Sequence, residues 1–135
     1  MLTPKVKVSF YMSGDDVDLD VLTEQIGIKP TKVRKKSEWP QVSISMGMAK
    51  DSWLLEKEKE ECIAVSTLFD KLQKILFPKT DIITALSKKY ALELSVTIVV
   101  EMEVGSGPEL VLTKENIAFL ALVNAEVGFD LYIDN

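Results

Sequence analysis

Residues 92–103, LELSVTIVVEME, decide the fold class of this chain. Apolar side chains occupy every even position from Leu92 to Met102, and most odd positions from Glu93 to Glu103 are polar. A period of two residues predicts a β-strand with one buried face. Because a strand of this length with a polar second face is typical of antiparallel sheets, we expect one sheet that is open to solvent on one side.

The same alternation predicts the first and the last strand. Near the N-terminal end the apolar positions are Val6, Val8, Phe10 and Met12. Near the C-terminal end they are Val127, Phe129, Leu131 and Ile133. Successive side chains of a strand point to opposite faces, so each set is expected to cover one face of the sheet.

The middle of the chain allows more than one interpretation. Residues 42–46 alternate and predict a strand that Gly47 ends. In residues 52–60 the spacing of Trp53 and Leu55 favours a strand, whereas the charged run 56–61 favours a helix by propensity. We expect a strand to about residue 59 and a further short strand at residues 110–112.

Four segments have helical signals. Residues 18–26 start with an aspartate cap and stop before Gly27, and residues 80–89 and 113–123 each start at a threonine. In residues 113–123 we expect Ile117, Leu120 and Ala121 to face inward. The fourth helix runs to Leu76 and carries an apolar stripe with helical spacing: Val65, Leu68, Phe69, Leu72, Ile75 and Leu76.

The resulting element order is β-α-β-β-α-α-β-(β)-α-β, which predicts a single α+β domain over residues 1–135. Its first part matches the βαββαβ order of ferredoxin-like folds. We therefore expect a ferredoxin-like antiparallel sheet with helices on one face, extended by an extra helix and a C-terminal strand.

The composition excludes several kinds of chemistry. The chain has no histidine, which rules out Ser-His-Asp and Cys-His catalysis and histidine metal sites. Asp16, Asp18 and Asp20 are spaced like the start of a calcium loop, but Val21 occupies the place of its tight-turn glycine. Acids at a helix start are favoured by the helix dipole. We therefore expect no metal, no cofactor and no enzymatic activity.

Charge and hydropathy limit the partners and the location. The net charge of −5 opposes nucleic-acid binding, and no apolar run approaches the ~20 residues that cross a bilayer. The first residues enter an alternating pattern without a secretory signal, and the single Cys62 cannot form an internal disulfide. We expect a cytoplasmic protein that does not bind membranes.

Residues 29–36 carry five positive charges and no acid, and Trp39 follows shortly after. Clustered cations beside an aromatic ring can bind an acidic protein surface. The alternative is that residues 29–40 form a solvated, exposed loop whose tryptophan packs against the sheet edge. The partner-binding candidates are Lys32, Arg34, Lys35, Lys36 and Trp39.

Two other kinds of interaction are open. The polar face of the sheet could serve a small-molecule-binding protein or an enzyme, and an open sheet edge could allow homo-oligomerisation. The ligand candidates on the polar face are Tyr11, Glu101, Glu103, Asp130 and Tyr132.

Several short motifs resemble a known family. They are the turn from Ile26 to Pro30, the step from Ser52 to Leu55, and the closing Asp130-x-Tyr132. With these motifs the chain resembles the bacterial family catalogued as domain of unknown function 4279. The resemblance implies a small, bacterial, cytoplasmic protein without established catalytic residues. Because some members lie near toxin genes, it also implies an immunity-type or other protein-binding role.

The charge distribution favours the same role. Without the five cations of residues 29–36, 11 basic and 21 acidic residues remain, a net charge of −10. An acidic body is suited to attracting a basic protein such as a toxin domain. We therefore expect a non-catalytic protein-binding module, with a protein as its partner.

Overall fold

The computed structural model describes residues 3–135 and contains one five-stranded sheet with the order β2-β3-β1-β4-β5. The strands are β1 (Lys5–Gly14), β2 (Lys32–Arg34), β3 (Asp51–Glu61), β4 (Glu93–Glu103) and β5 (Ala125–Asp134). The α-helices are α1 (Leu19–Ile26), α2 (Gln41–Ser45), α3 (Val65–Leu76), α4 (Thr80–Tyr90) and α5 (Lys114–Val123). Two 3-10 helices, η1 (Lys36–Glu38) and η2 (Phe77–Lys79), complete the chain. The predicted α+β class is confirmed.

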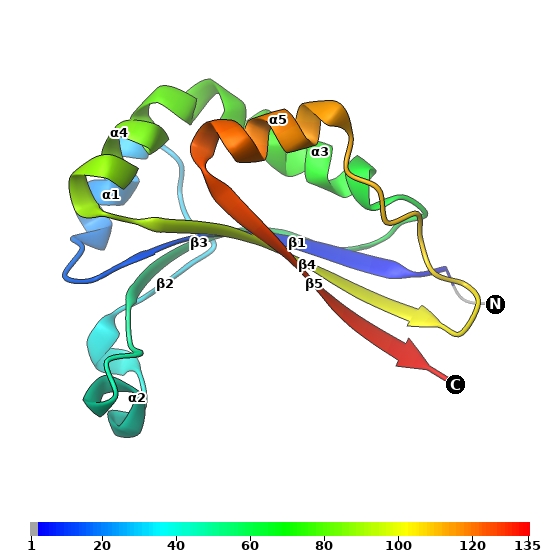
Figure 1. Ribbon diagram of the computed structural model, residues 1–135, viewed down its shortest axis with the longest axis horizontal. Coiled ribbons are helices and arrows are strands. Elements are labelled where there is room, and N and C mark those ends of the chain that lie inside the picture. Colours follow the sequence, from blue (N-terminus) through cyan, green and yellow to red (C-terminus); the bar gives the residue numbers. More distant parts are fainter. Residues whose placement is uncertain (1–2) are drawn as a thin grey trace.

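The helices are distributed unequally over the two faces of the sheet. Helices α1, α3, α4 and α5 lie over one face, and the short α2 projects on the other side beside β2 (Figure 1). The apolar rows of β1 and β4 are buried beneath the helix layer, including Phe10, Val96 and Ile98. From the helices, Leu68, Phe69 and Leu72 of α3 complete the centre of the core. The opposite face of the sheet therefore stays open, as the alternation predicts.

The sheet is mixed, which corrects the expectation of an antiparallel sheet. Pairs β1–β3, β1–β4 and β2–β3 are antiparallel, but β5 pairs with β4 in parallel. The reason is the connection through α5, because a helical crossover returns the chain in its original direction. The finer ferredoxin-like description remains a prediction.

Residues 51–61 form one continuous strand, which resolves the ambiguity in that region. Strand β3 pairs with β1 from Gly14↔Asp51 to Lys5↔Glu61, and helix α3 starts only at Val65. Pairing with a central strand therefore overrides the helical propensity of the Glu and Lys run.

Residues 42–45 lie in helix α2 and Met46 is its C-cap, so the strand predicted over residues 42–46 was wrong. The outer edge of β3 is occupied by β2, so residues 32–34 rather than residues 42–46 pair with that strand. Val42 and Met46 are 64% and 68% exposed, so their alternation does not mark a buried face. Residues 29–40 are also more ordered than the expected loop, since they contain β2 and η1.

Two smaller expectations also failed. Residues 110–112 form no strand, and the contact nearby is an isolated bridge between Ala64 and Glu109.

Helix α5 buries a different face from the one predicted. Ile117 is 57% exposed and Ala121 is also exposed, whereas Asn116, Phe119 and Val123 are buried beside Leu120. The helix is rotated so that the Asn116 amide can donate to Asp70 and Gln73 of α3, both at 2.8 Å. In α3, Ile75 is 37% exposed at the edge of the predicted stripe.

The predicted caps Asp18, Gly27 and Thr113 are confirmed, whereas Thr80 does not cap α4. Thr80 is the first residue of that helix, and its hydroxyl donates to the backbone oxygen of Phe77. Asp18 accepts hydrogen bonds from the backbone of Asp20 and Val21, and Gly27 ends α1 with a φ of 74°. Thr113 caps α5 through the backbone N–H of Asn116. Within the part of the chain that the structure describes, no helix is long and apolar enough to cross a membrane.

We predict that replacing Leu68 by alanine lowers the free energy of unfolding by about 2–5 kcal/mol, because the side chain is 1% exposed at the centre of the core. Urea denaturation measures this loss. The matched control is Met46→Ala at the exposed C-terminal end of α2, which should change stability by less than about 0.5 kcal/mol. Equal losses in both variants would contradict the described core.

Candidate functional site

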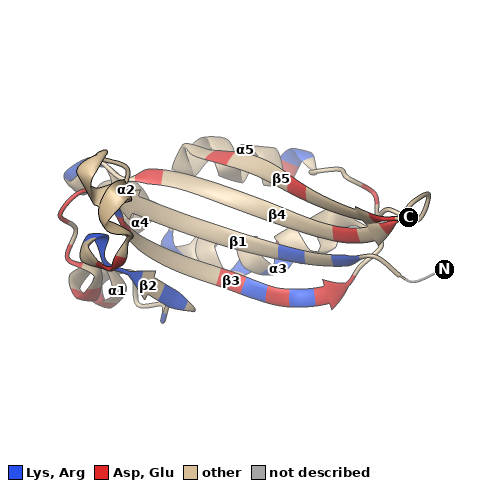
Figure 2. Cartoon of the chain, turned by 90° about the horizontal axis from the view of Figure 1, so that it is seen from below, with Lys and Arg blue, Asp and Glu red and all other residues tan. Residues whose placement is uncertain are grey.

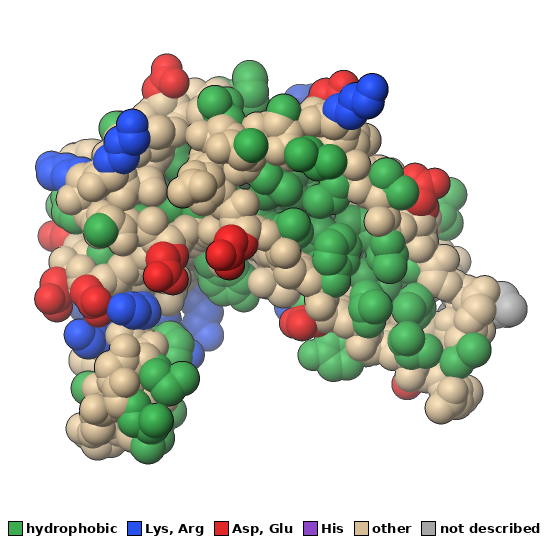
Figure 3. Space-filling view, in the orientation of Figure 1, with side chains coloured by type: hydrophobic (Ala, Val, Ile, Leu, Met, Phe, Trp, Pro, Cys, Tyr) green, Lys and Arg blue, Asp and Glu red, His purple; other side chains and the backbone are tan. Residues whose placement is uncertain are grey.

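A groove of about 430 Å³ opens on the polar face of the sheet, beside β2. Figure 2 shows this face, and Figure 3 shows the hollow that it forms beneath the sheet next to α2. We call it the sheet groove. Its lining residues are Tyr11, Ser13, Lys32, Val33, Arg34, Trp39, Ser52, Leu54, Ser95 and Thr97.

Strand register brings the polar residues of the sheet groove together. Tyr11 of β1 stands opposite Leu54 of β3 and Ser95 of β4, and Leu54 stands opposite Lys32 of β2. Directly paired residues of neighbouring strands share one face of the sheet. The row Lys32-Leu54-Tyr11-Ser95 therefore crosses four strands on the open side.

A second row follows two residues along each strand. Arg34 stands opposite Ser52, and Ser52 stands opposite Ser13. The two rows together place hydroxyl groups from three strands next to two cations from β2. This arrangement offers hydrogen-bond donors and positive charge to an anionic group.

Trp39 closes the groove at its β2 end. The guanidinium carbon of Arg34 lies 4.1 Å from the centroid of the Trp39 ring, a cation–π contact that holds the arginine against the indole. The indole Nε1 of Trp39 is buried and has no hydrogen-bond acceptor among the residues that the structure describes. By contrast, the indole of Trp53 in the core donates to Thr23 at 3.1 Å.

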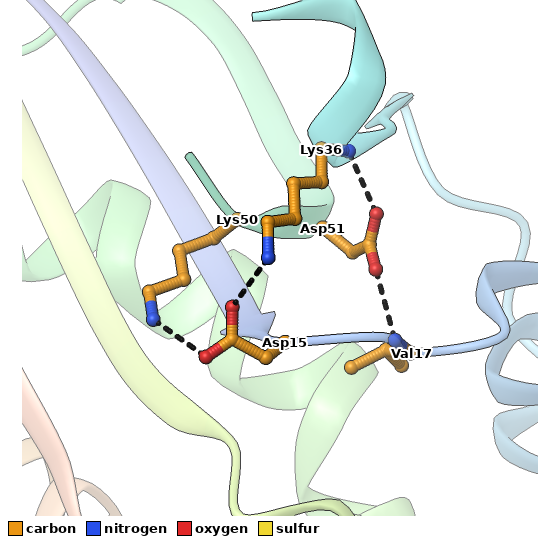
Figure 4. Close-up of polar contacts among 5 residues, drawn as sticks. All are labelled: Asp15, Val17, Lys36, Lys50 and Asp51. Carbon is orange, nitrogen blue, oxygen red and sulfur yellow. Dashed lines mark hydrogen bonds and ion pairs between the residues drawn. The ribbon is translucent and has the colours of Figure 1, made fainter. Parts of the chain in front are cut away.

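Asp51 fastens the basic segment to the domain (Figure 4). One carboxylate oxygen accepts from the backbone N–H of Val17 at 2.9 Å, and the other accepts from the backbone N–H of Lys36 at 2.7 Å. The side chain of Asp51 thus joins the turn after β1 to the segment after β2. This link sets the position of the residues between Arg34 and Trp39.

Asp15 adds a second, exposed link. Its carboxylate lies 3.0 Å from Nζ of Lys50 and 3.4 Å from Nζ of Lys36. Hydrogen bonds from these two lysines hold the pKa of Asp15 below its ordinary value, and the bond with Asp15 raises the pKa of Lys50. At the far end of the sheet, Lys59 lowers the pKa of Glu101 through a contact of 2.8 Å.

The structure divides the basic partner-binding candidates into two groups. Lys32, Arg34 and Trp39 line the sheet groove. Lys36 is engaged by Asp15, and with Lys35 it lines a separate hollow beside Asp16 and Asp18. Only the first group therefore points to a common binding site.

The ligand candidates on the polar face are also separated. Tyr11 joins the sheet groove, whereas Glu101, Glu103 and Tyr132 lie around another hollow at the opposite end of the sheet. Asp130 lies on the exposed strand β5. The five residues thus do not form one site, because the strands carry them to two distant places.

Sequence reasoning missed the serine and threonine residues of the groove. Ser13, Ser52, Ser95 and Thr97 are ordinary polar positions of predicted strands, and only the register between strands brings them together. Within residues 3–135 no group of three or more His, Cys, Asp or Glu side chains is arranged to hold a metal ion. The thiol of Cys62 contacts the backbone oxygen of Ala64 at 2.8 Å.

The fold and the groove define a small α+β protein whose sheet is covered by helices on one face and carries a polar groove on the other. The chain belongs to the family described as domain of unknown function (DUF4279), which matches residues 4–134. The predicted family is thereby confirmed over nearly the whole chain. Comparison with curated proteins and comparison with solved structures each returned no match.

We predict that Asp51→Ala lowers the free energy of unfolding by about 1–3 kcal/mol or more, because it leaves the buried backbone N–H of Val17 and that of Lys36 without an acceptor. Amide hydrogen exchange at Lys36 should accelerate as well. The control is Asp15→Ala, which keeps both backbone hydrogen bonds and should cause a smaller loss. If Asp15→Ala proves the more damaging change, Asp51 does not fasten the segment.

The lowered pKa of Asp15 predicts a contribution to stability that depends on pH. A carboxylate with a depressed pKa stabilises the fold above its ordinary value of 3.8, and the contribution is lost as the pH falls through the lower pKa of the folded state. The stability difference between the natural chain and Asp15→Asn should therefore shrink below pH 3.8 and at high salt. Denaturation curves of both proteins over this range provide the measurement, and a difference that grows in acid would refute the assignment.

Proposed function

We propose that this chain is a non-catalytic protein-binding module and that its sheet groove holds an acidic group of the partner. Residues Lys32 and Arg34 supply positive charge, and the hydroxyl groups of three strands supply hydrogen-bond donors. An aspartate or glutamate side chain of a partner segment has the charge and the acceptor atoms that this set of donors requires.

The buried indole N–H of Trp39 carries the proposal. A buried donor without an acceptor costs about 1–3 kcal/mol, so such a group points to a ligand that supplies the acceptor. Arg34 stacks on the same indole, so a carboxylate close to Trp39 would also be close to a guanidinium group. One acceptor group could thus satisfy both donors.

The lining of the groove supports binding without catalysis. It contains no carboxylate, imidazole or thiol, and the whole chain lacks histidine. General acid–base catalysis near neutral pH depends mostly on these groups. The proposal therefore assigns recognition, and no chemical step, to the groove.

We propose that the protein acts in the bacterial cytoplasm. An immunity-type role, in which the protein neutralises a toxin, is one form of this protein-binding function. A lone cysteine, Cys62, agrees with a reducing compartment. The excess of acidic residues outside the basic segment supports a partner with a basic region. Such a partner would use a different surface from the groove, because the groove itself is cationic.

A second candidate function is the binding of a small anionic molecule. The groove volume of about 430 Å³ lies within the usual range of ligand pockets, about 300–1,000 Å³. A carboxylate or phosphate compound would use the same donors. In the protein-binding function, partner residues on either side of the carboxylate add to the affinity. In the small-molecule function, the anionic compound by itself accounts for the binding.

We predict that a peptide rich in aspartate and glutamate binds the groove, and that Arg34→Ala weakens this binding about tenfold or more, as expected for a lost hydrogen bond to a charged group. Trp39→Phe keeps the ring and removes the N–H, so it should weaken binding by a smaller factor. Isothermal titration calorimetry measures both changes, and chemical shifts of Ser52 and Ser95 locate the site.

The matched control is Val42→Ala, which alters an exposed side chain of α2 outside the groove and should leave the affinity unchanged. Titration with inorganic phosphate and acetate separates the two candidates. Binding of these anions as tight as that of the peptide would favour the small-molecule function. Peptide binding that survives Arg34→Ala and Trp39→Phe undiminished would reject the groove as the site.

A further inference from the structure

Strand β5 continues the buried sheet but is not covered by the helix layer. Its alternating apolar residues Val127, Phe129 and Leu131 stand in register with Val96, Ile98 and Val100 of β4. The β4 residues are at most 1% exposed, whereas the β5 residues are 37%, 41% and 45% exposed. Figure 3 shows hydrophobic side chains gathered at this side of the molecule, near the C-terminal end. The apolar face of the sheet therefore continues past the helix layer and ends in the partly exposed side chains of β5.

The free edge of β5 lacks several of the usual protections against pairing. The strand is ten residues long, contains no proline or lysine, and is the last strand in the sheet order. The opposite edge strand, β2, has only three residues and carries Lys32 and Arg34. Short length and basic side chains are common ways to block an edge strand. Only the β5 edge therefore offers a long, regular template for another strand.

The open face of β5 is acidic. Glu126, Asp130 and Asp134 occupy the positions that alternate with the apolar row, and Asp134 stands opposite Glu103 of β4. Neither β4 nor β5 contains a lysine or an arginine. Figure 2 shows the acidic residues at the C-terminal ends of both strands. A segment beside β5 would therefore face apolar groups on one side and carboxylates on the other.

We propose that the free edge of β5 binds an extended segment of a partner protein in which apolar and basic residues alternate. The segment adds a sixth strand through backbone hydrogen bonds, and its apolar side chains cover Val127, Phe129 and Leu131. Its lysine or arginine side chains face Glu126, Asp130 and Asp134. This inference goes beyond the sheet groove and uses none of its residues.

Charge argues against a second copy of the chain as the occupant. Pairing of β5 with itself, with both helix layers on the same side, would place six carboxylates on one face of the two strands without a compensating cation. Like charges on neighbouring strands are destabilising. A basic segment would neutralise the carboxylates of β5 instead of repelling them. Charge complementarity therefore favours a different protein over a second copy of this chain as the occupant.

The test uses the full chain and a ten-residue peptide of alternating lysine and valine. A peptide with five lysines followed by five valines has the same composition without the alternation. We expect the alternating peptide to bind in low salt, to bind less at high salt, and to shift amide resonances of residues 126–133. Fluorescence anisotropy and two-dimensional NMR measure these effects, and the block peptide should bind at least about tenfold more weakly.

Asp130→Lys reverses one exposed charge and should weaken binding of the alternating peptide at least about tenfold, whereas Arg34→Ala in the sheet groove should have no effect. Circular dichroism checks that Asp130→Lys is folded. Equal binding of both peptides, salt-independent binding or shifts confined to the groove would overturn the proposal. A stable dimer of the free chain with β5 at its interface would overturn it as well, since a second copy would then occupy the edge.

Discussion

The structure depends on the burial of one face of β1 and β4 beneath the helix layer. Val6, Val8 and Phe10 of β1 are fully buried, and the even-numbered residues of β4 continue the same apolar surface. Burial of this area is the main favourable term in folding a chain of 135 residues without disulfides. Since side chains alternate along a strand, burying the even positions places the odd ones on the other face. The open polar face, with its groove, is therefore a consequence of the same pattern that builds the core.

Charge is distributed unevenly over the open face, with cations at β2, mixed charges at the far ends of β1 and β3, and carboxylates along β5. Lys32 and Arg34 lie at the β2 end, where Asp51 holds the following segment through two backbone N–H groups. The carboxylates of Glu103 and Asp134 lie at the far ends of β4 and β5. Because the cations of β2 and the carboxylates of β5 lie on opposite edge strands of the sheet, two partners could bind without competition. Electrostatic complementarity of this kind contributes more to specificity and association rate than to affinity.

Strand β5 connects these features to the shape of the domain. Its parallel pairing with β4 follows from the crossover through α5, and α5 packs against α3 through Asn116 rather than covering β5. The helix layer consequently leaves the apolar row of β5 partly exposed. Family membership over residues 4–134 includes this strand, so the uncovered margin lies within the family domain.

The sequence by itself determined most of the secondary-structure elements of this protein, through local periodicity and capping residues. Short-range patterns identified these elements correctly: the alternation in β1, β3, β4 and β5, the caps Asp18 and Thr113, and the helical stripe of α3. Residues 42–46 show the limit of such patterns, because alternation specifies a strand only where a neighbouring strand is available for pairing.

Only the tertiary structure decided which strands are neighbours and where side chains from distant segments meet. Register alone joins Tyr11, Lys32, Ser52 and Ser95 in one groove and carries Glu101 and Tyr132 to the other end of the sheet. The partner of Asp51, the orphaned N–H of Trp39 and the uncovered face of β5 likewise depend on contacts between residues far apart in the chain. Sequence spacing encodes which face a residue occupies, but the contacts on that face are set by packing and strand order.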